Sequence, residues 1–266
     1  MQHLFQSWQA LSAEIMAASH LLLLSDYDGT LTPIVGRPVD AILSPQVRAQ
    51  LITLAQKPTV SAGVISGRSL SELKSMVAIA GIYYAGNHGL EIEGPGLSFV
   101  SAAAEAAQAT IKTLAWQLVG VLGSTPGVII EDKGLSLSVH YRLVKPGEEK
   151  MVVETFNRVI SPLVNAGRVR ITSGKRVLEV RPPIDWHKGK AVEAITRELK
   201  ALLKLEQVLV IYMGDDTTDE DAFKAVHRPE GWSIFVGEKN APSSAGYFLN
   251  STTEVGEFLS RLIELK

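Results

Sequence analysis

The sequence contains no cysteine among its 266 residues. Disulfide bonds, thiolate nucleophiles and zinc sites built on cysteine are therefore excluded. A strong charge of either sign is also missing, because 26 Lys and Arg residues stand against 28 Asp and Glu residues, which gives a net charge of -2. A protein that binds a nucleic-acid backbone needs a strongly positive surface. We therefore expect no nucleic-acid partner, and an anionic ligand must be bound by a few local positive charges.

Long apolar runs are absent as well. The longest run in the N-terminal region is the four leucines at 21–24, far shorter than the roughly 20 residues of a membrane span. No basic signal-peptide region precedes it, and no lipidation motif is present. Apolar residues nevertheless make up 46% of the chain, which is typical of a protein with a buried core. We expect a soluble cytoplasmic protein without a membrane partner.

Short apolar runs of the kind found in buried parallel strands recur along the chain. They cover residues 21–25, 60–65, 208–213 and 233–236. Two of them are followed by helices that begin with a capping-box pattern, Ser69 with Glu72 and Thr217 with Glu220. Apolar strands that alternate with helices predict a Rossmann-like α/β core, in which helices cover both faces of a parallel sheet.

The middle of the chain has a different pattern. Helical patterns at 102–122 and 148–164 are mixed with strand-like segments at 128–132, 135–142, 169–172 and 177–181. Hairpins and helices in this mixture indicate an α+β module inserted into the core. At about 150 residues per domain, the length allows one large domain or two modest ones. We predict a core of residues 1–92 and 183–266 with an inserted cap of residues 93–182.

Polar motifs follow three of the predicted strands, and a lysine opens a later helix. They are Asp26-Tyr27-Asp28-Gly29-Thr30, Ser66-Gly67-Arg68, Gly214-Asp215-Asp216 with Asp219, and Lys188 at the start of a helix over 188–203. Ligands of open α/β sheets bind at the carboxyl ends of the strands, so these motifs should converge. Several carboxylates in one small space need a hard cation, and oxygen ligands suit Mg²⁺. Carboxylates with a metal, a lysine and a hydroxyl indicate phosphoryl transfer.

This series of motifs resembles the haloacid dehalogenase superfamily of phosphotransferases. The longer forms DYDGTLTPI, VISGR, GNHGLEI and GDDTTDEDAF narrow the resemblance to the trehalose-6-phosphate phosphatase family, over residues 21–262. The resemblance implies a haloacid dehalogenase-like fold with a cap domain. It also implies a phosphoric monoester hydrolase that splits trehalose 6-phosphate into trehalose and phosphate through an aspartyl-phosphate. That reaction is the last step of trehalose biosynthesis.

The resemblance assigns a role to each matching residue of the core. Asp26 would be the nucleophile, and Asp28 would protonate the leaving sugar oxygen and then activate water. Mg²⁺ would be held by the residues of the two aspartate motifs, with Asp28 contributing its carbonyl and the last two residues lying near the ion: Asp26, Asp28, Asp215, Asp216 and Asp219. The phosphate group would be bound by Ser66, Gly67 and Lys188, with Arg68 at the edge of the site. The family pattern of Lys before Gly favours Lys188 over Lys190.

The resemblance also points to sugar-binding residues in the cap: Glu131, Lys133, Arg142, Lys175 and Glu179. Charged groups of these types can hydrogen-bond a hydroxyl-rich ligand and exclude water when a module closes. Surface salt bridges on a polar sheet face are the alternative interpretation of the same residues. His140 either joins this set or braces the cap, and His88 is predicted to shape a turn.

Three other functions are compatible with the motifs. A related phosphatase could act on another glycosyl phosphate, such as a glucosyl- or mannosyl-glycerate phosphate. A non-catalytic module that binds sugar phosphates would most simply have lost Asp26 or Asp28, and both are present. A phosphomutase must exclude water and return the phosphate, and nothing in the sequence marks that requirement. The sequence leaves the oligomeric state and any synthase partner open.

Overall fold

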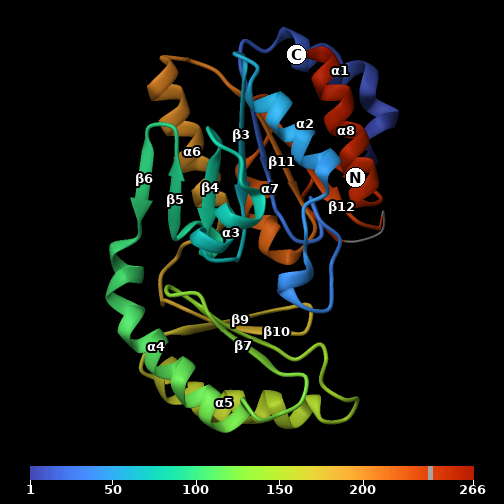
Figure 1. Cartoon of the computed structure of the whole chain (residues 1–266). Helices are drawn as coiled ribbons and strands as arrows, with labels where there is room; N and C mark the ends of the chain where they lie inside the picture. The colour runs from blue at the N-terminus through green and yellow to red at the C-terminus, as the bar shows by residue number, and fades with distance from the viewer. Residues whose placement is uncertain (239–241) are drawn as a thin grey trace. The chain divides into compact units, whose positions relative to one another are not determined.

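Two separate sheets organise the chain in the computed structural model, which describes residues 1–238 and 242–266 (Figure 1). The chain divides into unit 1, Met1–Phe99 with Trp186–Lys266, and unit 2, Val100–Asp185. The predicted cap, residues 93–182, starts several residues before the start of unit 2 and ends a few residues before the end of unit 2. The difference at its start arises because β5 (Glu91–Gly94) and β6 (Leu97–Val100) extend the sheet of unit 1.

The sheet of unit 1 has nine strands in the order β1-β13-β12-β11-β2-β3-β4-β5-β6. The remaining strands are β1 (Gln2–His3), β2 (Leu21–Ser25), β3 (Val60–Ile65), β4 (Tyr83–Gly86), β11 (Leu209–Gly214), β12 (Gly231–Val236) and β13 (Tyr247–Leu249). Neighbours from β1 to β4 pair in parallel, and β5 pairs antiparallel with β4. The parallel centre confirms the predicted α/β fold class.

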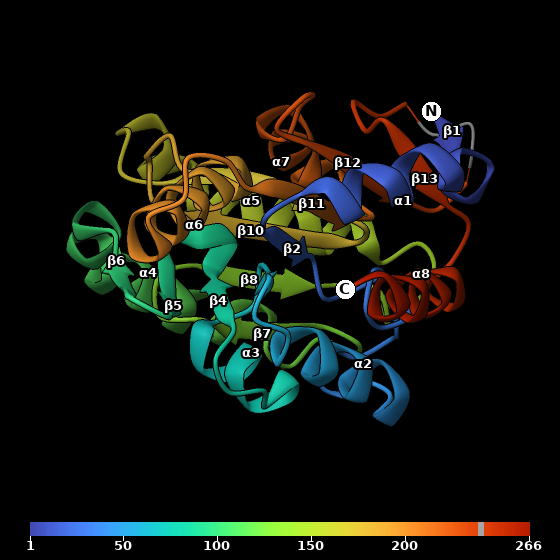
Figure 2. The same cartoon turned by 90° about the horizontal axis from the view of Figure 1, so that it is seen from above.

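Helices cover both faces of this sheet because alternate side chains of its central strand are apolar on both sides. Leu21 and Leu23 of β2 pack into one buried cluster, and Leu22 and Leu24 pack into another. Figure 2 shows α2 (Pro45–Ala55), α3 (Leu70–Val77) and α8 (Thr252–Leu265) on one side of the sheet and α6 (Lys188–Leu203) and α7 (Glu220–Ala225) on the other. A further helix, α1 (Trp8–Ala17), contacts α8. Short 3₁₀ helices are η1 (Leu4–Ser7), η2 (Pro38–Asp40), η3 (Asn87–Gly89) and η4 (Thr217–Asp219).

The predicted capping boxes have different outcomes. Ser69 caps α3 as expected, since its Oγ accepts a hydrogen bond from the Glu72 backbone N. The box predicted at Thr217 and Glu220 is wrong by one residue, because Asp216 and Asp219 form it instead. A carboxylate at the cap position can accept the backbone N–H of the turn, and Asp216 Oδ1 accepts from Thr217 N at 2.7 Å.

Unit 2 contains an antiparallel sheet of four strands in the order β7 (Ile129–Asp132), β8 (Leu137–His140), β10 (Val177–Arg181) and β9 (Arg170–Gly174). Helices α4 (Ala102–Leu122) and α5 (Glu149–Asn165) pack against the apolar face of this sheet. The core between them includes Leu118, Val139 and Phe156. This arrangement confirms the inserted α+β module. In the described part of the chain, no helix has the length and hydropathy needed to cross a membrane.

Candidate active site

Three aspartates meet where two neighbouring strands of unit 1 end. Asp26 follows β2 and Asp215 follows β11, and these strands run parallel and side by side. The backbone N of Asp26 donates to the carbonyl of Met213 at 2.8 Å, which fixes the relative position of the two strand ends. Asp219 comes from η4, and one carboxylate oxygen of each aspartate lies within 4.8 Å of the others. The predicted convergence of these three residues is confirmed, and the trio is a candidate metal site.

Gly29 allows the Asp215 carboxylate to lie close to the backbone that follows β2. Its φ of +86° lies in a region that L side chains rarely adopt, and a Cβ atom at this position would lie 2.2 Å from Asp215 Oδ2. The glycine that follows the DYD motif therefore permits both the turn after β2 and the close approach of Asp215.

Lys188 supplies the positive charge at the centre of the trio. It is the first residue of α6, it is 2% exposed, and its Nζ donates to Asp26 Oδ1 and Asp219 Oδ1 at 2.7 Å each. Burial disfavours the charged lysine, but the Asp219 and Asp26 carboxylates outweigh burial and raise the pKa of Lys188 above its ordinary value. Lys190, the other candidate, is only half-buried. The geometry therefore supports the choice of Lys188.

One lysine does not balance three buried carboxylates. Burial raises the pKa of Asp26 well above its ordinary value, and the carboxylates of Asp219 and Asp215 raise it further, although Lys188 acts in the opposite direction. The ionised form that a nucleophile needs is thus disfavoured by these protein groups alone. A bound cation would remove this penalty, so the trio has both the oxygen ligands and the charge deficit expected of a metal site.

Asp219 is held by four hydrogen bonds. Its Oδ1 accepts from Lys188 and from the Tyr212 hydroxyl, the latter at 2.6 Å. Its Oδ2 accepts from the backbone N atoms of Asp215 and Asp216 at 3.1 and 3.0 Å. Tyr212 lies in β11 and is fully buried, and it belongs to none of the motifs identified in the sequence. The hydroxyl of a buried tyrosine usually needs a hydrogen-bond partner, and this requirement could have indicated Tyr212 as a polar contact near the site.

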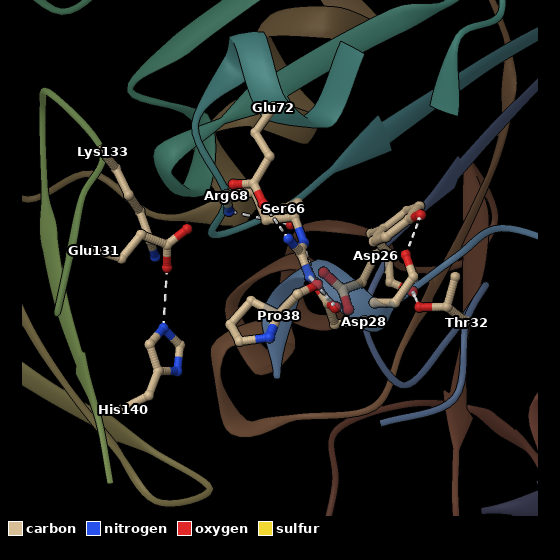
Figure 3. A network of polar contacts seen from close by, with 12 residues as sticks. Asp26, Asp28, Thr32, Pro38, Ser66, Arg68, Glu72, Glu131, Lys133 and His140 are labelled. Carbon is tan, nitrogen blue, oxygen red and sulfur yellow. Dashed lines mark hydrogen bonds and ion pairs between the residues drawn. The ribbon is translucent and has the colours of Figure 1, made fainter. Parts of the chain in front are cut away.

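Asp28, which was expected to converge with these aspartates, is not part of the trio and is paired with Arg68 (Figure 3). Arg68 Nε donates to Asp28 Oδ2 and Arg68 Nη2 donates to Asp28 Oδ1, both at 2.8 Å. The remaining donors of the guanidinium contact Glu72 and the carbonyl of Pro38. Such a bidentate pair fixes the orientation of the carboxylate. Arg68, predicted at the site edge, therefore contacts Asp28 directly, a pairing that the sequence analysis missed.

The Ser66-Gly67 turn carries a second contact that the sequence does not reveal. Ser66 is 1% exposed, and its Oγ accepts from the backbone N of Arg68 at 3.2 Å. A Cβ at Gly67 would lie 2.7 Å from His88 Nε2, so the imidazole packs directly against this glycine. His88 has a φ of 58°, and its backbone N donates to the Ser66 carbonyl at 2.8 Å. The prediction that His88 shapes a turn is confirmed.

In unit 2, Glu179 forms the centre of a polar cluster on the sheet. Lys133 Nζ and Ser136 Oγ donate to its Oε1, each at 3.3 Å, and Thr172 Oγ1 donates to its Oε2 at 3.2 Å. Glu179 is 7% exposed, which rules out a solvated surface ion pair at this position. Three neighbours thus fix both oxygens of one buried carboxylate.

The other predicted cap residues form two further contacts. His140 Nε2 lies 3.0 Å from Glu131 Oε2, which supports a bracing role for this histidine (Figure 3). Arg142 Nη2 donates to the carbonyl of Lys175 at 2.8 Å, at the turn between β9 and β10. Sugar binding by these residues stays a prediction.

The sequence matches the family described as trehalose-phosphatase over residues 24–253. The chain belongs to the trehalose-phosphatase family. A relative from Oryza sativa subsp. japonica, a probable trehalose-phosphate phosphatase 4, is 37% identical over 260 residues, which cover 95% of this chain and 69% of the relative. Members of this family are phosphoric monoester hydrolases, so the chain is assigned to that enzyme class.

Solved structures support the same fold. The C-terminal domain of a trehalose-6-phosphate phosphatase from C. albicans has a TM-score of 0.80 and 27% identity, with 97% of each chain covered. A haloacid dehalogenase-like hydrolase from Bacteroides thetaiotaomicron has a TM-score of 0.58 at 16% identity, and the alignment covers 91% of this chain and 99% of the hydrolase chain. The second likeness shows the haloacid dehalogenase fold alone.

Proposed function

We propose that the chain hydrolyses trehalose 6-phosphate to trehalose and phosphate in a Mg²⁺-dependent reaction. The observation that carries the proposal is the bridge of Lys188 between Asp26 and Asp219 inside the carboxylate trio. A lysine and oxygen ligands around one buried carboxylate suit the transfer of a phosphoryl group to that carboxylate. The family match supplies the substrate, and relatives carry trehalose-phosphate phosphatase as their name.

Asp26 is the nucleophile in this proposal. Lys188 holds its Oδ1, and in the described part of the chain its Oδ2 accepts no hydrogen bond, which leaves that oxygen available to attack phosphorus. The new bond joins Asp26 to phosphorus while the bond from phosphorus to the sugar oxygen breaks. Asp28 donates a proton to the departing sugar oxygen. Asp28 then takes a proton from water, which attacks the phosphorus and releases Asp26 and phosphate.

Asp26, Asp215 and the carbonyl of Asp28 would hold Mg²⁺, with Asp216 and Asp219 close by. The donor set fits, because all these groups offer oxygen and the charge of the trio is not balanced by Lys188. When bound, the ion neutralises the negative charge on the phosphate oxygens. The four hydrogen bonds to Asp219 favour a role in positioning Lys188 and the backbone after Asp215.

Recognition of the sugar is proposed for the polar cluster of unit 2. The oxygens of Glu179 are fixed by three neighbours, and His140 fixes Glu131, so these carboxylates are oriented before a ligand binds. Preorganised charged acceptors suit sugar hydroxyls, since less side-chain freedom is lost on binding. Lys175, in the β9–β10 turn, and Arg142, which follows β8 and donates to the Lys175 carbonyl, complete the proposed set together with Lys133.

A phosphate-release assay over a panel of sugar phosphates tests the proposal. The panel contains trehalose 6-phosphate, glucose 6-phosphate, and glucosyl- and mannosyl-glycerate phosphates, each with Mg²⁺ and with excess chelator. We expect trehalose 6-phosphate to be preferred and chelation to abolish release. Preference for a glycerate compound would transfer the proposal to that substrate class. Absence of release from every compound would favour a non-catalytic module, and full release in chelator would contradict the metal requirement.

A further inference from the structure

A cavity of about 460 Å³ lies in unit 1 between α6, the start of β11 and the segment that joins α7 to β12. Its volume is within the range of ordinary small-molecule sites. The proposed phosphatase reaction does not use any of the residues that line it. The cavity therefore needs an explanation of its own.

This cavity is remote from the carboxylate trio. Val210, in its wall, precedes Asp215 by five residues along an extended strand, a separation of about 17 Å. Lys200, also in its wall, lies twelve residues beyond Lys188 on the same helix, which corresponds to about 18 Å. The trio lies at the carboxyl edge of the parallel strands and the cavity at their amino edge. The two sites can thus bind different molecules at once.

Buried apolar side chains form one part of the cavity lining, and more exposed charged side chains of both signs form the other. Val192, Val210 and Val226 are buried and form part of its lining. Arg197 and Lys200 stand three residues apart on α6, so their side chains share one helix face. Within the described residues, neither side chain makes a hydrogen bond or an ion pair. Glu193 and Glu230 line the same cavity, but within the described residues neither forms an ion pair with Arg197 or Lys200, so both cations are available to an anionic group of a ligand.

Three further polar residues line the same cavity. His227, whose side chain also makes no hydrogen bond or ion pair in the described chain, adds a ring nitrogen from the segment after α7. Glu193 and Glu230 offer carboxylate oxygens, which accept hydrogen bonds from hydroxyl or amino groups. A ligand that satisfies all these groups needs an apolar body, hydroxyl or amino donors, and an anionic end with several oxygens.

We propose that this cavity binds an organic phosphate monoester with a flat apolar body, the chemistry of a nucleoside monophosphate. The phosphate pairs with Arg197 and Lys200, whose donors match its three oxygens. The ring lies on the valine surface, and the ligand's hydroxyl groups donate to Glu193 or Glu230. This proposal is independent of the proposed function, because none of its residues takes part in the reaction.

The absence of cysteine from the chain allows a local test. Thr196 lines the cavity, and Thr196→Cys places a single thiol there without a large change in volume. Ala10 is exposed on α1 and lies outside the cavity lining, so Ala10→Cys is the matched control. The rate at which Ellman's reagent modifies each thiol is measured with adenosine monophosphate, with adenosine and with inorganic phosphate. A thiol at position 196 does not report binding at the distant trio.

We expect adenosine monophosphate to protect Thr196→Cys and to leave Ala10→Cys unaffected. At ten times its dissociation constant, the ligand should slow modification about tenfold, because about one site in eleven stays open. Adenosine and inorganic phosphate at the same concentration should protect far less, since each lacks half of the required chemistry. In a Thr196→Cys chain that also carries Arg197→Gln and Lys200→Gln, protection by the nucleotide should disappear.

Two results would overturn the proposal. One is no protection of Thr196→Cys by adenosine monophosphate at about 10 mM, a concentration that fills even a site of millimolar affinity. The other is protection that survives Arg197→Gln and Lys200→Gln in a chain whose far-ultraviolet circular dichroism and unfolding midpoint match the parent.

Discussion

Lys188 lets Asp26 and Asp219 lie side by side, because its buried ammonium group donates to both carboxylates at 2.7 Å. Asp219 in turn is fixed by Tyr212, so a chain of hydrogen bonds runs from a buried strand residue to the proposed nucleophile. At the scale of single residues, the site is therefore a network in which each charge is oriented by a neighbour. Its function should be sensitive to groups that never touch the substrate.

Tyr212→Phe tests this network. Loss of the hydroxyl should reduce the free energy of unfolding by about 1 kcal/mol and should also lower kcat, because Asp219 and Lys188 lose a fixed position. Tyr84→Phe is the matched control, since its buried hydroxyl donates to the Ile79 carbonyl on another part of the sheet. We expect similar destabilisation by both changes in urea titrations but reduced kcat only for Tyr212→Phe. Equal kcat values would show that the Tyr212 hydroxyl serves stability alone.

At the scale of elements, buried apolar runs made several strands predictable. Strands β2 and β3 and helices α4 and α6 begin and end at the predicted residues, because each has a clear apolar pattern and a marked boundary. The strands at 83–100 were not predicted: β4 contains most of a four-residue apolar run at 82–85 that resembles the others, whereas β5 and β6 carry no such run and depend on pairing with the rest of the sheet. The capping box of η4 was predicted one residue too late, because Asp216 and Thr217 are both suitable N-cap residues and each has an acidic residue three positions later.

The site was predictable to the extent that topology dictates it. Motifs at the ends of parallel strands must lie at one edge, which brought Asp26 and Asp215 together. Side-chain pairing across the fold was not predictable, because it depends on how close residues far apart in the sequence come in space. Arg68 pairs with Asp28 forty positions earlier in the chain, and no local pattern records that contact.

The turn after β2 provides a prediction at this scale. Gly29→Ala should destabilise the fold and abolish most activity, because a Cβ would need a positive φ and would collide with the Asp215 carboxylate. Gly81→Ala isolates the backbone effect, since Gly81 has a φ of +78° and no atom within 4 Å of its added Cβ. An L residue with positive φ costs about 1–2 kcal/mol. We therefore expect a comparable backbone penalty in both variants and loss of phosphate release only in Gly29→Ala; normal activity of that variant would contradict the proposed role of the turn.

At the scale of the whole molecule, the chain carries two units with separate cores and separate polar clusters. The cluster of unit 1 has the groups needed for phosphoryl transfer, and the cluster of unit 2 has oriented carboxylates without a candidate metal trio among the described residues. This division predicts that chemistry and sugar selectivity can be altered separately by substitution.

Glu179→Ala tests this division. The change should reduce kcat/KM for trehalose 6-phosphate by an amount equivalent to about 1–3 kcal/mol, because a charge-assisted hydrogen bond to the sugar is lost. Hydrolysis of a small aryl phosphate, which needs only the groups of unit 1, should change little. Glu154→Ala, which removes an exposed ion pair with Lys150 on α5, is the control and should leave both substrates unaffected. Equal losses on both substrates would show that Glu179 supports the fold.

The phosphoryl acceptor is the central claim, and covalent trapping tests it most directly. Asp28→Asn should slow turnover by roughly 10² to 10⁴-fold, because an acid–base group of this kind contributes that much. With a phosphate ester that has a good leaving group, this variant should accumulate a phosphorylated chain, detected by mass spectrometry as one added phosphoryl group on the peptide that contains Asp26. Asp26→Asn should give no phosphorylated chain and almost no phosphate. Phosphorylation of the Asp26→Asn variant, or of any peptide other than the one with Asp26, would contradict the account.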